Sequence, residues 1–373
     1  MSVTLRDVAE QAGVSPMTVS RVINGGTGVN AKTRERVKKV IGELGYLPNT
    51  IARSLSHHTS GTLAMLVPDV ANPFFMLNLR GVESVARQHG YRVMLCNTES
   101  DLTLEDAYIQ DMLAHQIDGL VIAPTSDHSR RHLRLPQQHN VPLVLIDRTV
   151  EGIECDVVLG DNIGGAQQLI EHLITAGHRR IAMICGPLDV STSRDRLQGY
   201  RQAIAAGGAE DDPQLVIEGQ VNVPGGCVAM QQVLLLDPRP TAVFTVNNLV
   251  AVGAVQTMRE RGLEVPRDMA LVCFDDIELA SQLLPFLTVM AQPAETFGTI
   301  AAQLLIERIA GRTTERPRRV VLTPEMVVRV SSGGRVRSGR MFRLAILTLE
   351  KSFAAKCFGP TTAPARRPAR HTR

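Results

Sequence analysis

Polar and aromatic side chains follow several short apolar runs of the chain, at the point where each run ends. The set is Asn72, Phe74, Phe75, Asp147, Arg148, residues 191–196, Asn247, Asp275 and Gln292. A phenylalanine face packs against the CH face of a sugar ring, while carboxylates, guanidinium groups and amides pair with the ring hydroxyls. If these side chains converge, they form a binding site for a polyhydroxylated ring.

The elements that would position these residues alternate through the body of the chain. The expected strands are residues 62–67, 91–96, 119–123, 142–146, 180–185, 214–218, 241–245 and 269–274, and the expected helices include 75–89, 163–176, 193–206, 225–236 and 248–261. This alternation predicts parallel sheets with helices on both faces. The strands are too many for one compact sheet, so we expect two similar lobes, with crossings near Asp161 and near residues 288–293. Ligands of such sheets bind beyond the carboxyl ends of the strands, here between the lobes.

Residues 4–24 read TLRDVAEQAGVSPMTVSRVIN and predict two short helices joined by a tight turn. The apolar residues of the first helix end at Ala12, and Gly13 breaks the pattern. Ser15 is suited to cap the second helix, and Pro16 to occupy its first position. The outer face of this second helix is expected to carry Pro16, Met17, Ser20 and Arg21. A helix-turn-helix has this form, and its second helix fits the major groove of DNA; an ordinary helical hairpin is the alternative.

A third helix is expected at residues 31–44, capped by Asn30 and ended by Gly45. The motifs GYLPN (45–49) and IARSL (51–55) then follow. Together with AEQAGVSPMTVSRVIN (9–24), in this order and spacing, they resemble the N-terminal headpiece of the lactose/galactose repressor (LacI/GalR) family. Each motif alone is only moderately specific, whereas three in register at the N-terminus are a strong signal.

The resemblance implies that a homodimer binds a pseudo-palindromic operator in double-stranded DNA. Met17 and Arg21 would read base edges, since the forked donors of Arg21 suit guanine, and Pro16 offers only apolar contact. Phosphate contacts or helix caps are expected at Thr4, Ser15, Thr18, Asn24 and Asn30, with Ser20 also on the DNA-facing side. A hinge helix at residues 49–56 would fold on binding and contact DNA through Asn49, Ala52, Arg53 and Leu55. Leu55 would wedge between central base steps, the alternative being an apolar contact within the linker.

The resemblance also implies a core like that of periplasmic sugar-binding proteins. Individual residues resemble the ligand-contacting residues of ribose-type binding proteins and of the family. The effector residues that this resemblance implies are Asn72, Phe74, Phe75, Asp147, Arg148, Thr192, Arg196, Asn247, Asp275 and Gln292. At any single position, capping or anchoring a helix is the alternative. A purine corepressor is disfavoured, because Val190 stands where the purine repressor has its first effector arginine. Val221 and Asn222, neither of them aromatic, stand near the position of its stacking aromatic residue. The paired arginines Arg148 and Arg196 leave a sugar acid possible as the effector.

Enzymatic functions find little support in the sequence. No GxGxxG motif follows the first strand, and neither a GxxxxGK[ST] loop nor a GxSxG elbow is present. His128 and His132 lie four residues apart, but without a third ligand nearby we expect a solvated helix face rather than a zinc site. Asp275 and Asp276 follow a strand and should point in different directions, so they do not form a catalytic pair. We therefore expect no catalysis, no metal and no cofactor.

Charge is distributed unevenly along the 373 residues. The net charge is +3 overall, +4 for residues 1–60 and +9 for residues 333–373, which leaves −10 for residues 61–332. A basic N-terminal segment joined to an acidic central region is typical of a protein that contacts phosphates through one end only. No apolar run is long enough to span a membrane and no signal segment is evident, so we expect a cytoplasmic protein. The six cysteines are scattered and read as buried hydrophobes.

The expected domains are a headpiece at 1–47, a hinge at 48–60 and a core at 61–332. Within the core, lobe 1 would hold residues 61–161 and 292–322, and lobe 2 residues 162–288 and 323–332. From Arg335 the chain departs from the family pattern, and residues 333–373 are expected to form a basic, disordered extension without a tetramerisation helix.

These features together predict a DNA-binding transcriptional regulator, most consistent with a repressor whose operator affinity is controlled by a sugar, polyol or sugar acid. Effector binding would rotate one lobe against the other and alter the two hinge helices. The alternatives are a sugar-binding or signalling module without operator function, and a global regulator that takes a protein as its effector.

Overall fold

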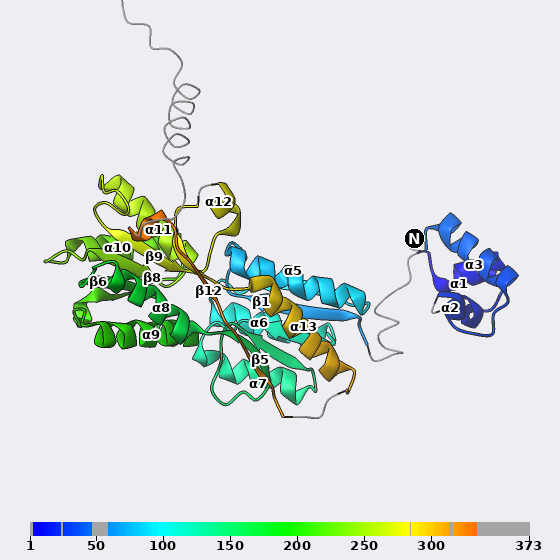
Figure 1. Cartoon of the computed structure of the whole chain (residues 1–373). Helices are drawn as coiled ribbons and strands as arrows, with labels where there is room; N and C mark the ends of the chain where they lie inside the picture. The colour runs from blue at the N-terminus through cyan, green and yellow to red at the C-terminus, as the bar shows by residue number, and fades with distance from the viewer. Residues whose placement is uncertain (1–2, 24, 47–58, 284, 313–315, 334–373) are drawn as a thin grey trace, which may run out of the picture.

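The computed structural model describes residues 3–23, 25–46, 59–283, 285–312 and 316–333. These residues form a helical headpiece and a two-lobed α/β core (Figure 1). The helices are α1 Leu5–Ala12, α2 Pro16–Ile23, α3 Ala31–Leu44, α5 Pro73–Gln88, α6 Leu102–Ala114, α7 Arg130–Gln138, α8 Asn162–Thr175, α9 Ser191–Gly207, α10 Val223–Leu235, α11 Asn248–Glu260, α12 Glu278–Leu283 and α13 Ala294–Ile309. The strands are β1 Thr62–Val67, β2 Arg92–Asn97, β3 Gly119–Ile122, β4 Leu143–Ile146, β5 Asp156–Gly160, β6 Ile181–Cys185, β7 Val216–Glu218, β8 Ala242–Thr245, β9 Ala270–Phe274, β10 Thr288–Ala291, β11 Arg319–Leu322 and β12 Glu325–Val327.

The headpiece helices pack around a small core that includes the fully buried Val8, Val19 and Val37. Gly13 ends α1 with a φ of 61°, a left-handed conformation that glycine adopts without steric cost, and so allows the sharp turn into α2. At the other end of α1, Thr4 forms a capping box with Asp7. The predicted helix-turn-helix is therefore present in the fold.

Lobe 1 is built on a sheet with strand order β11-β5-β4-β3-β1-β2, in which every strand pair is parallel. Alternate residues of β1 point to opposite faces: Leu63 packs in the cluster with α5 and α13, and Ala64 in the cluster with α6. Helices α5 and α13 approach closely, since a Cβ atom at Gly298 would lie 1.8 Å from the Asn78 carbonyl oxygen. Helices therefore cover both faces of this sheet.

Lobe 2 repeats the plan with strand order β12-β10-β9-β8-β6-β7. Strand β12 is antiparallel to β10, and the other pairs are parallel. Residues Ile181 and Met183 of β6 pack in the cluster with α8 and α9, whereas Ala182 and Ile184 pack in the cluster with α10 and α11. The inner strands are buried on both faces, which explains why their sequences are continuous apolar runs.

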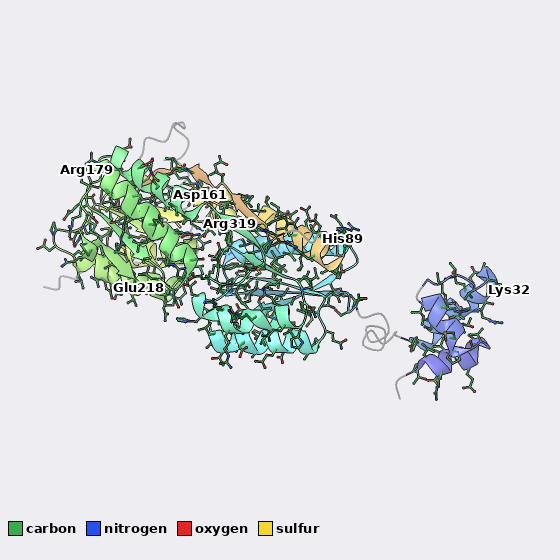
Figure 2. The ribbon with its side chains drawn as sticks, turned by 90° about the horizontal axis from the view of Figure 1, so that it is seen from below. Lys32, His89, Asp161, Arg179, Glu218 and Arg319 are labelled. Carbon is green, nitrogen blue, oxygen red and sulfur yellow. The ribbon has the colours of Figure 1, made fainter. Side chains whose placement is uncertain are left out.

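The chain passes between the sheets after β5, after β10 and after β11. Two of these crossings are joined by a hydrogen bond from the Asp161 backbone N–H to the Leu322 carbonyl oxygen at 3.0 Å. Asp161 and Arg319 lie near the junction of the lobes in Figure 2, while Arg179 and Glu218 lie on lobe 2. The carboxyl ends of the strands of both sheets can therefore contribute to one cleft.

The predicted fold class is confirmed, but four strands were missed. Strands β5, β10, β11 and β12 each lie at a crossing, and none was expected as a strand; residues 288–293 were expected only as a crossing. Asp156 interrupts the apolar pattern of β5, β11 begins with Arg319, and β12 is a three-residue strand beginning with Glu325. Within the described ranges no helix is long and apolar enough to cross a membrane.

Candidate effector cleft and nucleic-acid interface

One small cavity between the lobes gathers the predicted effector residues. Its lining is Asn72, Phe74, Phe75, Asp147, Arg148, Val190, Thr192, Ser193, Arg196, Val221, Val246, Asn247 and Asp275. Of the ten predicted residues only Gln292 is not in this lining, and its Nε2 donates to Asp275 Oδ1 at 2.8 Å. The carboxyl ends of both sheets supply the residues, as the topology requires.

The two cleft aspartates occupy matching places in the two lobes. Asp147 follows β4 and Asp275 follows β9, and both have left-handed backbones, with φ of 63° and 66°. This conformation costs a residue other than glycine roughly 1–2 kcal/mol. Each backbone N–H nevertheless continues the sheet, donating to Val158 and Met290 respectively. Both aspartates line the inner cavity.

Arg196 is the most heavily bonded side chain of the cleft. Its Nε donates to Asn162 Oδ1 at 2.8 Å and its Nη1 to the Val246 carbonyl at 2.6 Å. The guanidinium lies 3.8 Å from the Phe274 ring centre and 3.6 Å from Asp275 Oδ2. Burial raises the pKa of Asp275 to about 6, although Arg196 and Gln292 oppose that rise. Arg196 thus anchors α9 as well as lining the inner cavity.

The Asp147 and Arg148 pair leaves atoms without partners. Arg148 Nη1 donates to the Pro124 and Thr125 carbonyls at 2.9 and 3.1 Å, and its Nε lies 3.7 Å from Asp147 Oδ2. Burial lowers the pKa of Arg148. The buried Asp147 Oδ1, Arg148 Nε and Gln292 Oε1 have no hydrogen-bond partner within the part of the chain that the structure describes. Buried polar atoms of this kind need a partner, and a ligand in the cleft is one source.

Two predicted ligands also serve as helix caps. Asn72 Oδ1 accepts from the Phe74 N–H and caps α5, and Asn247 Oδ1 accepts from the Val250 N–H and caps α11. Asn72 Oδ1 also accepts from Asn248 Nδ2 at 3.2 Å, a bond that joins the lobes. The capping alternative considered from sequence therefore holds at these two positions, without excluding ligand contact by the remaining amide atoms.

The lobes are held close together. Arg194 of α9 donates to both oxygens of Asp127 across the cleft, at 2.6 and 3.3 Å, and the Thr149 N–H donates to Ser191 Oγ at 3.0 Å. The inner cavity has a volume of about 30 Å³, which is room for water but not for a sugar ring. A ring enters this site only when the lobes separate or the lining side chains move.

A wider chamber of about 880 Å³ adjoins the inner cavity and shares Arg148, Val190 and Val221 with it. Its charged lining is acidic apart from Arg148: Asp69, Glu99, Asp101 and Asp189. Within the inner cavity two carboxylates balance two guanidinium groups. The cleft as a whole therefore has an excess of negative charge.

The headpiece presents a different kind of surface. Met17 is 65% exposed and Arg21 is exposed on the outer face of α2, while Val19 and Val22 of the same helix are buried. Pro16 is also exposed. These side chains are free to enter a groove without any change in the core beneath them.

Several predicted phosphate contacts already cap helices. Thr4 accepts from the Asp7 N–H, Ser15 Oγ from the Thr18 N–H at 3.2 Å, and Asn30 Oδ1 from the Thr33 N–H at 2.8 Å. Ser15 and Thr18 also share a hydroxyl contact at 2.9 Å, and Ser20 is half-buried. The predictions at Asn24, Asn49, Ala52, Arg53 and Leu55, and those for residues 334–373, lie outside the described residues.

The expectation for His132 is wrong. Its ring is buried, and Nε2 lies 2.5 Å from Oε1 of the buried Glu105, so this side of α7 is not solvated. His128 is largely exposed and lies 3.8 Å from Asp189. The partner of His132 is 27 residues away in sequence, which explains why the RRHLR run suggested an exposed face.

Other lining residues had weaker signals or none. Ser193 lies within the stretch 191–196 that the sequence indicated, whereas Val246 is one apolar residue in an apolar run and gave no sign of its position. Asn162, which orients Arg196, carried no signal either. In the described ranges no group of three or more His, Cys, Asp or Glu side chains is arranged to hold a metal. Burial raises the pKa of Cys155 and of Cys185 to about 12, so neither is a ready nucleophile.

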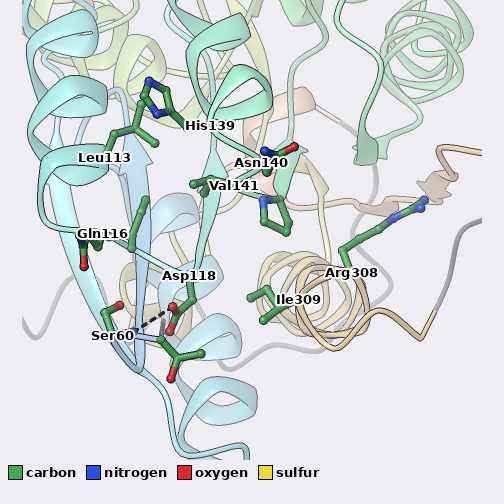
Figure 3. A pocket seen from close by; sticks show the side chains of 12 residues that line it. Ser60, Leu113, Gln116, Asp118, His139, Asn140, Val141, Arg308 and Ile309 are labelled. Carbon is green, nitrogen blue, oxygen red and sulfur yellow. Dashed lines mark hydrogen bonds between the residues drawn. The ribbon is translucent and has the colours of Figure 1, made fainter. Parts of the chain in front are cut away.

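A separate cavity of about 580 Å³ lies at the other end of lobe 1, before the amino ends of β1, β3 and β4 (Figure 3). Asp118 accepts hydrogen bonds there from the Ser60 and Gly61 N–H groups at 2.9 and 2.7 Å. This carboxylate fixes the place where the chain enters the core. The cavity contains none of the predicted effector residues, so the site assignment stays with the cleft.

Comparison with known proteins agrees with this geometry. Residues 4–49 match the family described as bacterial regulatory proteins, lacI family, and residues 60–329 match the periplasmic binding proteins and sugar binding domain of LacI family. The ribose operon repressor of Escherichia coli strain K12 is 37% identical over 329 residues, which cover 88% of this chain and 99% of that protein. The transcriptional repressor PurR of Aliivibrio salmonicida is 33% identical over 328 residues, covering 88% and 98%.

A solved structure titled as the Lac repressor dimer bound to operator and the anti-inducer ONPF matches with a TM-score of 0.77 and 29% identity, covering 89% of this chain and 99% of that one. These relatives are transcriptional repressors rather than enzymes. Two family matches and relatives covering most of both chains leave one assignment: the chain belongs to the LacI family of bacterial regulatory proteins.

Proposed function

We propose that the chain is a homodimeric transcriptional repressor that binds a pseudo-palindromic operator and responds to a neutral sugar or polyol between its lobes. The observation that carries the DNA-binding role is the outer face of α2, where Met17 and Arg21 are exposed above a buried core. Arg21 suits a guanine edge, and Pro16 suits an apolar contact. Such a protein acts in the cytoplasm, where its operator is.

The hinge and the domain boundaries are part of this proposal. Residues 1–47 form the DNA-binding unit, residues 48–60 the hinge, and residues 61–332 the effector and dimerisation core. On operator DNA the hinge folds, and Leu55 enters the minor groove and opens a central base step. Residues 333–373 add no operator affinity, so their removal leaves that affinity unchanged.

Dimerisation is supported by exposed apolar side chains on both lobes. Met94 and Leu95 are exposed on β2, the edge strand of the first sheet, and Val252 and Leu283 are exposed on lobe 2. Large exposed apolar residues at a sheet edge favour covering by another surface. Two headpieces held at a fixed spacing supply the specificity that one lacks.

The polar atoms of the cleft favour a neutral effector. Among the described residues, Asp147 Oδ1 and Gln292 Oε1 are buried acceptors that receive no hydrogen bond, and Arg148 Nε is a buried donor that makes none, with Asp147 Oδ2 3.7 Å away. A hydroxyl group both donates and accepts, whereas a carboxylate or phosphate cannot donate to Asp147. The acidic chamber beside the site adds repulsion, so a sugar acid is disfavoured. A purine is disfavoured as well, since the lining at Val190 and Val221 offers no charge or aromatic ring.

The test is fluorescence anisotropy of labelled DNA from upstream of the protein's own gene, titrated with the full chain. D-ribose, D-gluconate, D-ribose 5-phosphate and hypoxanthine are added in turn. We expect specific binding that D-ribose or another neutral sugar alters and that the two anions do not. If the chain bound this DNA no better than scrambled DNA, a sugar-binding module without operator function would be favoured. If it bound the operator but no small molecule altered that binding, a protein effector would be favoured.

A further inference from the structure

Glu105 on α6 is a fully buried carboxylate that contributes nothing to the lining of the cleft. Its Oε2 accepts from the Thr125 N–H at 2.6 Å, and its Oε1 lies 2.5 Å from His132 Nε2. Burial pushes the pKa of Glu105 up, but hydrogen bonds from His132, Ser129 and Thr125 outweigh it, and the pKa ends below its ordinary value. The lobe therefore keeps an ionised group in its interior.

A buried charge of this kind is a poor source of stability. The cost of removing it from water is several kcal/mol per ion, and packed apolar side chains of similar volume often serve a fold as well or better. Thr125, Ser129 and His132 supply the hydrogen bonds of Glu105, and the buried residues of the apolar cluster to which α6 and α7 contribute include Ile109 and Leu133. The position of this carboxylate therefore calls for an explanation beyond packing.

The groups that Glu105 holds lead directly to the effector cleft. Thr125 lies in the loop after β3, and the carbonyls of Thr125 and its neighbour Pro124 accept from Arg148 Nη1. The same Arg148 borders both the inner cavity and the wider chamber, and its Nε makes no hydrogen bond to the described residues, although Asp147 Oδ2 lies 3.7 Å away. The Pro124–Thr125 peptide unit therefore carries both contacts: its N–H donates to Glu105, and its carbonyl oxygen accepts from Arg148.

His132 completes the arrangement from the side of α7. Its Nε2 points to Glu105, and its Nδ1 lies 4.0 Å from Oδ1 of Asp106, which is 44% exposed. Helices α6 and α7 are thereby joined through the same carboxylate that holds the loop. A displacement of either helix would be passed to the loop and to Arg148.

We propose that Glu105, oriented by His132, is a positioning residue for effector binding: it fixes the loop at Pro124 and Thr125 so that Arg148 presents Nε to the ligand. This inference rests on the proposed effector site for its consequence, but its structural part does not. The charge-assisted bond to the Thr125 amide is the essential contact, since such bonds are stronger than neutral ones.

The ligand-independent test is NMR of the full chain with ¹⁵N-labelled arginine side chains, in which the Arg148 Nε–H signal is assigned with Arg148→Met. We expect Glu105→Gln, which keeps the shape and removes the charge, to shift or broaden this signal. Asp106→Asn is the matched control, because it removes a carboxylate near the same histidine without touching Thr125, and it should leave the signal in place. An Arg148 signal unchanged by Glu105→Gln overturns the proposal, whether or not a sugar binds.

The functional test is a double-mutant cycle with D-ribose, or with the neutral sugar that alters operator binding. Glu105→Gln should lower the affinity for that sugar about tenfold in the wild-type background. In a protein that already carries Arg148→Met, it should lower the affinity little further. Operator affinity of the sugar-free protein should not change. An equal loss in both backgrounds would show that Glu105 acts by holding the lobe together rather than through Arg148, and would overturn the positioning role.

Discussion

The headpiece and the effector cleft use their polar side chains in opposite ways. In α2 the outward residues Met17 and Arg21 are exposed, and the fold of the headpiece depends on Val8, Val19 and Val37 beneath them. In the cleft, Arg196 and Asp275 are buried and form an ion pair at 3.6 Å, and Arg196 also donates to the Val246 carbonyl oxygen. Recognition and stability are separate in the first region and shared in the second.

This difference has a consequence for how each region responds to change. An exposed side chain on a finished core can be exchanged at little cost in free energy of unfolding. A buried side chain that orients a helix and, as we propose, also contacts the ligand cannot be exchanged without affecting both. We therefore expect substitutions in the two regions to have clearly different effects.

The largest effect should follow Arg196→Met. The substitution leaves Asp275 without its cationic partner, and Asn162 and the Val246 carbonyl without a donor. Removing one partner of a buried ion pair costs about 3–5 kcal/mol in free energy of unfolding. Urea unfolding of the full chain measures this loss; a cost near zero would mean that the cleft arginine is as dispensable for folding as an exposed one.

Arg21→Ala should change DNA discrimination and leave stability alone. Loss of a bidentate contact to guanine costs about 1–3 kcal/mol of discrimination for each half-site. Lys39→Ala is the control, because it removes a charge from the exposed face of α3, where Lys39 pairs with Glu43 at 3.7 Å. Parallel titrations of operator and scrambled DNA, with thermal melting of each variant, separate the two effects. Equal loss of both DNA affinities in the Arg21 variant would reduce its role to a phosphate contact.

Asp275 should make the stability of the cleft depend on pH. Its pKa is raised to about 6 by burial, so the native state holds this proton more tightly than the unfolded chain does. Its contribution to stability is present at low pH and is lost as the pH rises from about 4 to about 6. Asp275→Asn should flatten the stability profile in that window, as measured by denaturation at a series of pH values. A profile of unchanged slope would contradict the assignment.

The smallest effect is expected for Arg194→Gln. Arg194 and Asp127 join the lobes, but both side chains are partly exposed, and exposed pairs contribute only about 0.2–1 kcal/mol. We expect the free energy of unfolding to stay unchanged and the lobes to shift modestly toward separation. Fluorescence energy transfer between dyes on the two lobes measures that shift. A cleft contact that behaves in this way would resemble the headpiece residues. A large loss of stability would instead extend the shared role of the cleft to its rim.

The sequence predicted the elements whose signals are local. The helices of the headpiece follow from apolar spacing, from Gly13 and from the caps at Thr4 and Asn30, and the inner strands follow from continuous apolar runs. Strands β11 and β12 did not, since they are short, half-exposed and recognisable only by their pairing with β5 and β10.

The same limit applies to the cleft. Positions at the carboxyl ends of strands could be predicted, because parallel topology brings those ends together. The bonds that orient them could not, since Arg196 depends on Asn162 and Val246, and Arg148 depends on a loop held by Glu105. Such contacts join residues tens of positions apart, and no local pattern encodes them.

The most direct measurement is the anisotropy of a labelled fragment from upstream of the protein's own gene, titrated with the full chain with and without D-ribose or another neutral sugar. We predict tight, sequence-dependent binding by a dimer, a change in affinity on adding the sugar, and loss of that change alone in Arg148→Met. Binding that does not distinguish this fragment from scrambled DNA, or an Arg148→Met variant that still responds fully to the sugar, would contradict the account.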